Sequence, residues 1–254
     1  MPENLAPVRL DEALDSARYG HKAATLAALR RGGHNVPDGF VIPVGMAWDR
    51  EALLAPLAAL GAGPYAVRSS GVAEDLAGAS FAGQYESVLG ALSIDDVVNA
   101  AGRVLASGKG ARVAAYRADQ GAAEGRLAVL VQRLVAAEAA GVMFTKNPVT
   151  GDDEIVLEAV RGLGDRLVDG AAEAERWLQR GSELVLPSAP SVLDEQAARR
   201  LVELGARIER ERGAPQDVEW ALAGGELFVL QARPITGLPR RPPIEIPPGR
   251  WTKD

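Results

Sequence analysis

The chain has 254 residues, a net charge of -6 and no cysteine. This length allows one large domain or two small ones, and the missing cysteines exclude disulfides, thiolate metal sites and thiol catalysis. The negative charge and an aromatic content of 5% argue against nucleic acid or an anionic membrane as the main partner. No apolar run is long enough for a membrane span, and MPENLAPVRL lacks the features of a secretory signal. We therefore expect a cytoplasmic protein.

The first half of the chain is predicted to be mainly helical, because its apolar residues recur at helical spacing. Helices are expected at 11–31 with a break near Tyr19 and Gly20, at 47–60 up to a limit set by Pro56, at 94–107 and at 112–119. Short strands are expected at 40–42 and 65–68. The glycine-bounded stretch 121–125 is predicted to separate two parts of the chain.

The second half is predicted to be rich in strands, with runs at 127–134, 140–145 and 154–159, a helix at 191–211 and a final hairpin turning at Gly224-Gly225. The fold class is expected to be α+β, with two lobes and a cleft between them. The lobes are predicted to span 1–125 and 126–237, and the proline-rich segment 238–254 is interpreted as a linker or tail.

The stretch YAVRSSGVAEDLAGASFAGQYES combines one arginine with many small residues. Arg68 follows a predicted buried strand, and the small residues after it leave room for a ligand. The segment from Gly78 to Gly83 offers backbone N–H groups suited to phosphate oxygens, and Ser87 adds a hydroxyl. Glu74 and Asp75 are predicted to orient Arg68. The alternative is an ordinary flexible loop with a structural ion pair.

Two other segments are weaker candidates on their own. Lys22 follows a glycine near a helix start and is suited to contact a phosphate, although a solvated lysine on a helix face is the more common explanation of such a position. The exit of the strand at Gln132 to Val135 has backbone groups that are suited to an adenine edge, but its spacing defines no fixed chemistry.

The final hairpin brings polar side chains to one face. Glu219, Gln231 and Arg233 alternate with apolar residues, so they are predicted to meet on one side of the hairpin. Carboxylate and amide oxygens suit Mg²⁺, and a guanidinium suits phosphate. This combination predicts a magnesium-triphosphate site, with an exposed cross-strand salt bridge as the alternative.

Four ordered stretches carry a family resemblance: GHKAATLAAL…VPDGFVI, AVRSSGVAEDLAGASFAGQYESVLG, VLVQRLVAAEAAGVMFTKNPVTGDDEIVLEAVRGLGDRLVDG and PQDVEWALAGGELFVLQARPIT. Together they resemble the N-terminal ATP-binding domain of the phosphoenolpyruvate synthase, pyruvate phosphate dikinase and rifampicin phosphotransferase superfamily. The resemblance covers most of residues 19–236. It implies an ATP-grasp fold with ATP and Mg²⁺ as cofactors.

The resemblance also implies roles for single residues. The implied phosphate contacts and catalytic residues are Lys22, Arg68 and Arg233; Gly83 and Ser87 cover the triphosphate; Gln132, Leu134 and Val135 hold the adenine; and Glu219 and Gln231 bind Mg²⁺. His21 and Ser87 depart from the family, which usually has glycine and threonine there.

The implied function is transfer of a phosphoryl group from ATP to a histidine on a separate or missing domain, and from there to an acceptor such as pyruvate or an antibiotic hydroxyl. The implied partners are therefore a phosphocarrier-histidine domain or protein and an acceptor-binding domain. We expect either an excised N-terminal domain or one component of a split system. A stand-alone small-molecule kinase and a non-catalytic nucleotide-binding module remain as alternatives.

Overall fold

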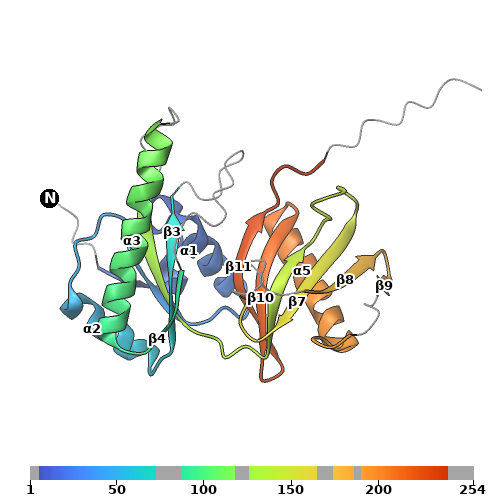
Figure 1. Ribbon diagram of the computed structural model, residues 1–254, viewed down its shortest axis with the longest axis horizontal. Helices are drawn as coiled ribbons and strands as arrows, with labels where there is room; N and C mark the ends of the chain where they lie inside the picture. Colours follow the sequence, from blue (N-terminus) through green and yellow to red (C-terminus); the bar gives the residue numbers. More distant parts are fainter. Residues whose placement is uncertain (1–5, 73–86, 118–125, 165–173, 186–189, 240–254) are drawn as a thin grey trace, which may run out of the picture.

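The structure is a computed structural model that describes residues 6–72, 87–117, 126–164, 174–185 and 190–239, with side chains up to residue 107 in the helix that ends at 117. Two antiparallel sheets with helices packed against them make up the fold (Figure 1). The predicted α+β class with two lobes is confirmed.

The first sheet has the strand order β1-β2-β5-β3-β4. Its strands are β1 (Val8–Arg9), β2 (Gly39–Ile42), β3 (Tyr65–Gly71), β4 (Ser87–Ala91) and β5 (Leu127–Arg133). The helices of this part are the short η1 (Leu10–Glu12), α1 (Ser16–Arg31), α2 (Arg50–Leu60) and α3 (Ile94–Arg117). An apolar cluster joins α2 and α3 to one face of the sheet, whereas α1 lies between the two sheets and contacts both β3 and β11 (Figure 1).

The second sheet has the strand order β11-β10-β6-β7-β8-β9. Its strands are β6 (Ala139–Phe144), β7 (Glu154–Arg161), β8 (Glu175–Arg180), β9 (Glu183–Val185), β10 (Gln216–Ala223) and β11 (Glu226–Pro234). Helix α5 (Glu195–Arg212) contacts β10 and β6. Its apolar stripe, which includes Leu201 and Ile208, is buried with Trp177 and Trp220, so the amphipathic helix predicted here is confirmed.

The apolar core does not stop at the boundary between the sheets. One cluster of buried side chains includes residues of α1, of β5 and of the second sheet with α5. Helix α1 therefore packs against both lobes, which fixes the position of its residues relative to each sheet.

The chain passes from the first sheet to the second after Arg133. Strand β5 pairs with β2 and β3, although the predicted lobe boundary at 125 assigns it to the second lobe. The change of sheet occurs between β5 and β6, because β6 pairs with β7 and β10. The lobe boundary at 125 as such stays a prediction.

Some predicted elements differ from the observed ones. The two helices expected at 94–107 and 112–119 form the single helix α3, because glycine in a helix costs only about 1 kcal/mol and does not by itself end it. Helix α2 likewise continues through Pro56 to Leu60. Strands β4, β8 and β9 were not predicted, since their exposed or short segments lack a clear apolar alternation.

Candidate functional site

Lys22 is positioned by a close contact between α1 and the end of β3. Gly20 has φ 76° and ψ 161° inside α1, so the helix is kinked there as predicted. A Cβ atom on Gly20 would lie 2.1 Å from the carbonyl oxygen of Ser70, and only glycine permits this approach. Beyond the kink, the Ser70 hydroxyl accepts a hydrogen bond from the amide of Ala23 at 3.0 Å. This contact caps the turn that carries Lys22, whose side chain is buried.

The side chain of Arg68 reaches from the first sheet to the second. Strand β3 holds the backbone of Arg68 between β4 and β5. The guanidinium donates to Oε2 of Glu219 at 2.6 Å, to the carbonyl oxygen of Leu230 at 2.6 Å and to Oε1 of Gln231 at 3.3 Å. The Arg68 side chain is only 14% exposed. A fork of donors in a rigid plane suits this arrangement of three acceptors.

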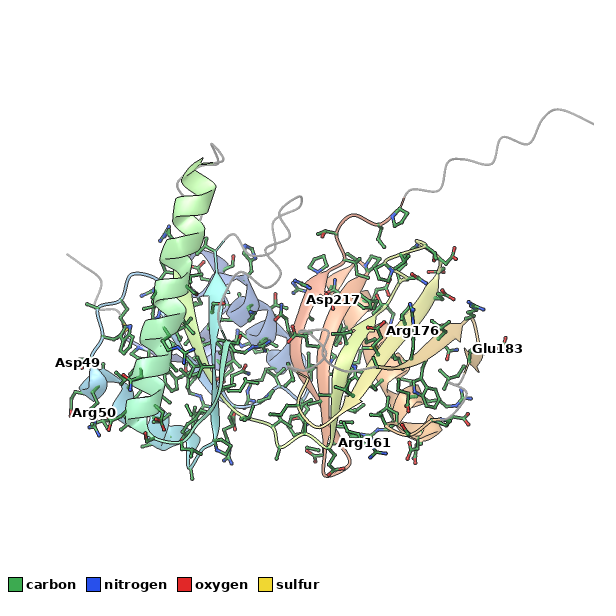
Figure 2. All side chains as sticks on the ribbon, viewed as in Figure 1. Asp49, Arg50, Arg161, Arg176, Glu183 and Asp217 are labelled. Carbon is green, nitrogen blue, oxygen red and sulfur yellow. The ribbon has the colours of Figure 1, made fainter. Side chains whose placement is uncertain are left out.

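The hairpin of β10 and β11 presents its polar side chains in two registered pairs. Glu219 lies opposite Gln231, and Asp217 lies opposite Arg233. Arg233 donates to Oδ2 of Asp217 from Nε at 2.9 Å and from Nη2 at 2.8 Å. Asp217 lies on the side of the second sheet nearest the first, whereas Arg176 lies further away (Figure 2). The structure therefore brings the hairpin residues together with Arg68.

Charge keeps the Glu219 carboxyl ionised. Burial alone would raise its pKa, but the charge of Arg68, then that of Lys22, and the hydrogen bond from Arg68 lower the pKa of Glu219 below its ordinary value. The charge of Lys22, which lies on α1, therefore acts on a residue of the hairpin. The Glu219 carboxylate thus lies within the field of several cations.

Asp217 has the opposite balance. Burial raises the pKa of Asp217 above its ordinary value, and the charge and hydrogen bonds of Arg233 offset that effect only in part. Its side chain is 12% exposed, compared with 35% for Arg233. A cross-strand salt bridge therefore exists on the hairpin, but it joins Arg233 to Asp217 rather than to Glu219, and its carboxylate is nearly buried rather than solvated.

The structure describes only a part of the predicted phosphate loop. Gly83, Glu74 and Asp75 lie outside the described residues. Ser87 begins β4 and lies directly opposite Arg68 in the strand pair, and it is exposed. The acidic partner that Arg68 has among the described residues is Glu219, which is 151 positions away in the chain.

The exit of β5 is partly occupied by internal hydrogen bonds. The side-chain amide of Gln132 donates to the carbonyl oxygen of Pro37 at 3.1 Å, and the backbone N–H of Leu134 donates to the carbonyl oxygen of Pro64 at 2.9 Å. Among the described residues, no hydrogen bond uses the N–H of Val135. The adenine role of this segment stays a prediction, and within it the backbone of Val135 is the part that suits a ligand.

Two contacts of the site were not predicted from the sequence. Asp217 lies two positions before Glu219 in β10, and this strand spacing is the signal that it shares a face with Glu219, opposite Arg233. Ser70 caps a helix 47 positions away, and no local pattern predicts such a contact.

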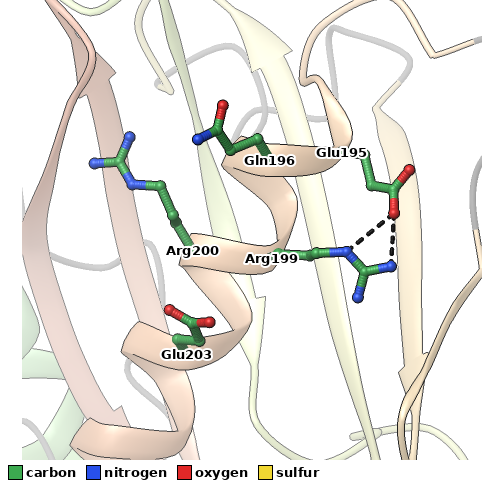
Figure 3. A pocket seen from close by; sticks show the side chains of 5 residues that line it. All are labelled: Glu195, Gln196, Arg199, Arg200 and Glu203. Carbon is green, nitrogen blue, oxygen red and sulfur yellow. Dashed lines mark hydrogen bonds and ion pairs between the residues drawn. The ribbon is translucent and has the colours of Figure 1, made fainter.

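A hollow on α5 lies apart from these residues. Its lining residues are Glu195, Gln196, Arg199, Arg200 and Glu203 (Figure 3). Arg199 donates to Glu195 at 2.6 Å and 3.0 Å across one helical turn. Both side chains are about half exposed, which is typical of a solvated helix face. The hollow contains none of the predicted site residues.

In the described part of the chain, no group of three or more His, Cys, Asp or Glu side chains is arranged to hold a metal ion. No helix in the same residues has the length and apolar character needed to cross a membrane.

Comparison with known families identifies the class of this protein. Residues 50–185 and 180–248 match the family described as the pyruvate phosphate dikinase AMP/ATP-binding domain. The chain belongs to this family. The two antiparallel sheets with their helices fit the ATP-grasp class expected from the sequence.

Several curated relatives share this region. The chain is 36% identical over 212 residues to the phosphoenolpyruvate synthase of Pyrococcus furiosus, a match that covers 68% of this chain and 26% of the relative. It is also 36% identical over 204 residues to a rifampicin phosphotransferase of Streptomyces sp., covering 68% and 24%. The chain therefore spans about a quarter of the length of these relatives.

Among solved structures, the L-amino acid ligase of Bacillus licheniformis aligns with 87% of this chain and 43% of its own, at 12% identity and a TM-score of 0.49. A likeness of this size supports no argument about function.

Proposed function

We propose that this chain binds Mg-ATP beside Arg68 and passes a phosphoryl group to a histidine on another domain. The observation that carries the proposal is the set of contacts made by Arg68, whose guanidinium joins β3 to Glu219 and Gln231 of the second sheet. Arg68 lies within β3 rather than at its end, and the charge of the buried Lys22 acts on the same carboxylate of Glu219; two such cations suit a triphosphate. Membership of an AMP/ATP-binding family supports the nucleotide.

In this proposal the cations bind the phosphates. Lys22, Arg68 and Arg233 neutralise the charge that develops as the phosphoryl group leaves, which is the main task of a protein in phosphoryl transfer. Ser87 and the segment ending in Gly83 cover the triphosphate. Gln132, Leu134 and Val135 contact the adenine from the connection between the two sheets.

The donor set of the hairpin fits Mg²⁺ that arrives with a nucleotide. Glu219 offers a carboxylate and Gln231 an amide oxygen, side by side on neighbouring strands. Mg²⁺ is commonly held by one or two carboxylates together with substrate phosphates, rather than by a cage of protein ligands. When bound, Mg²⁺ would neutralise phosphate charge at these two residues.

The phosphoryl acceptor lies beyond this chain. A phosphocarrier-histidine domain or protein would take the phosphoryl group, and an acceptor-binding domain would pass it to a substrate such as pyruvate or an antibiotic hydroxyl. Two relatives carry the names phosphoenolpyruvate synthase and rifampicin phosphotransferase. AMP, phosphate and a phosphorylated acceptor are the products expected of the complete system.

Calorimetry with Mg-ATP and phosphorus NMR test the proposal. We expect saturable binding of Mg-ATP, and formation of AMP and phosphate once a histidine-domain partner is added. ADP as the product would instead indicate a stand-alone kinase. Binding without turnover, even with the partner present, would indicate a nucleotide-binding module. Absence of any Mg-ATP binding, with Arg233→Ala indistinguishable from wild type, would refute the proposed site.

A further inference from the structure

We propose that Arg68 blocks the metal ligands while no nucleotide is bound, so that a divalent cation enters the site only together with a phosphate that takes Arg68 away. This inference rests on the proposed function and concerns the order in which the parts of that site assemble. Its basis is that the two oxygens suited to the metal, on Glu219 and Gln231, are the acceptors of the same guanidinium nitrogen.

The first step of the argument is the overlap of contacts. Nη2 of Arg68 lies 2.6 Å from Oε2 of Glu219 and 3.3 Å from Oε1 of Gln231. A cation bound by these oxygens would need the same region between them. The third contact, from Nη1 to the carbonyl oxygen of Leu230 at 2.6 Å, fixes the guanidinium in this position. Arg68 and a metal ion therefore compete for one place.

The second step is the charge balance. The Glu219 carboxylate is compensated by the guanidinium of Arg68 at 2.6 Å and by the charge of Lys22. A divalent cation entering this field would be repelled by both cations at short range and in partly buried surroundings. Because the Arg68 side chain is only 14% exposed, water screens this repulsion less than it would on an open surface.

The third step is the small number of ligands. In the described part of the chain, no cluster of three or more acidic or histidine side chains stands ready for a metal. One carboxylate and one amide oxygen make a weak site for Mg²⁺, which keeps its waters unless phosphates replace them. The metal alone therefore lacks the binding free energy to displace a guanidinium with three hydrogen bonds.

A triphosphate changes both sides of this competition at once. Its oxygens give Arg68 a new bidentate partner, and they add ligands to the metal. The release of Glu219 and Gln231 by Arg68 and the arrival of the metal are then coupled. The consequence is that nucleotide and metal bind cooperatively, and that Arg68 determines the cooperativity.

The test is titration with Mn²⁺, observed by electron paramagnetic resonance, in the absence of nucleotide. Arg68→Met removes the guanidinium and keeps an unbranched apolar side chain. We expect Arg68→Met to bind Mn²⁺ about tenfold more tightly than wild type, which corresponds to about 1.4 kcal/mol. Glu219→Gln introduced into Arg68→Met should abolish this gain, because the Glu219 carboxylate is the metal ligand that the loss of the guanidinium sets free.

Arg176→Met is the matched control. It removes one positive charge from the sheet that carries Glu219. Arg176 lies on β8, and its Nε is 3.9 Å from Oε1 of Glu158 on β7, rather than next to Glu219. We expect its affinity for Mn²⁺ to equal that of wild type. Thermal melts of each variant establish that the protein is folded, and Arg68→Lys serves as a second variant that keeps the charge with fewer donors.

The results separate this inference from the proposed function. Equal affinity for Mn²⁺ in wild type, Arg68→Met and Arg68→Lys, all folded, would overturn the inference even if wild type binds Mg-ATP. A gain in both Arg68→Met and Arg176→Met would show a general charge effect and would also overturn it. A gain in Arg68→Met alone supports it, and calorimetry with Mg-ATP then tests the function independently.

Discussion

Arg68 and Glu219 are separated by 151 positions in the chain and joined by a hydrogen bond of 2.6 Å between two different sheets. The donor comes from a strand between two neighbours in the first sheet, and the acceptor comes from the second strand of the other sheet. Because both backbones are held by strand pairing, this contact fixes the relation of the sheets at the candidate site.

Arg68→Ala should remove phosphoryl transfer while leaving the fold intact. The loss of one preorganised hydrogen-bond donor to the charge that develops in a transition state costs about 10²–10³-fold in rate, so we expect a decrease of at least that size in the complete system. Circular dichroism and a thermal melt check the fold, and phosphorus NMR measures the products. Turnover at the wild-type rate in a folded Arg68→Ala would show that Arg68 is only a structural link.

Gly20→Ala should be strongly destabilising for a steric reason. The added Cβ would lie 2.1 Å from the carbonyl oxygen of Ser70, in addition to the strain of φ 76°. We expect a loss of about 2–4 kcal/mol in the free energy of unfolding, measured with urea. Weaker binding of Mg-ATP should accompany it, because the turn with Lys22 moves.

Gly45→Ala is the control for this effect. Gly45 has φ 75°, but an added Cβ there meets nothing within 4 Å. We expect this variant to lose only about 1–2 kcal/mol, the cost of a left-handed residue without a clash. Equal losses in the two variants would mean that the contact with Ser70 contributes nothing.

The sequence predicted which side chains share a face of the hairpin better than it predicted their contacts. Alternation along the hairpin was sufficient to place Glu219, Gln231 and Arg233 on one face, because strand periodicity is a local property. The partner of Arg68 was expected among nearby acids, Glu74 and Asp75. Among the described residues, its acidic partner is Glu219. This pairing depends on how the two sheets meet, and no local pattern contains that information.

The same distinction applies to the fold. Helix α5 was predicted from its apolar stripe, and the cap at Asp194 and the left-handed Gly213 fix its ends at Glu195 and Arg212. Strand β5 was also predicted, but its membership of the first sheet was not. Periodicity identifies an element, whereas the choice of its neighbours is made by long-range pairing.

Glu211→Gln should reduce the pH dependence of stability. Glu211 Oε2 lies 2.6 Å from Nε2 of the buried His34, and this hydrogen bond is the main cause of a lowered pKa of Glu211. Because the pKa of Glu211 is lower in the folded protein than its ordinary value of 4.5, the ionised carboxylate stabilises the fold at pH values above 4.5. That contribution is lost as the pH falls through the lower pKa of the folded protein.

Urea unfolding at pH 7 and at progressively lower pH checks this sign. We expect Glu211→Gln to be less stable at pH 7 by up to about 1 kcal/mol, since the side chain is 40% exposed, and the difference should shrink below pH 4.5. Glu195→Gln, at the other end of α5, breaks an exposed pair and should change stability by under about 0.5 kcal/mol. A difference that grows on acidification would contradict the assignment.

Asp217→Asn should separate positioning from stability. Asn keeps the size of the side chain and one oxygen for Arg233, but it removes a charge whose burial raises the pKa of Asp217. A raised pKa of an acid means that folding becomes less favourable as the pH rises from the ordinary value of 3.8 toward the higher value of the folded protein. The variant avoids that cost, which offsets its weaker bond to Arg233.

We therefore expect Asp217→Asn to keep the free energy of unfolding at pH 7 within about 1 kcal/mol of wild type. Binding of Mg-ATP should nevertheless weaken, by about tenfold, because a neutral amide oxygen orients the guanidinium of Arg233 less firmly than the carboxylate that accepts its two hydrogen bonds in the wild type. Urea unfolding and calorimetry on the same preparation measure the two effects. A loss of several kcal/mol in stability with unchanged affinity would assign Asp217 to the fold alone, since a residue that only holds the hairpin together has no reason to affect the nucleotide.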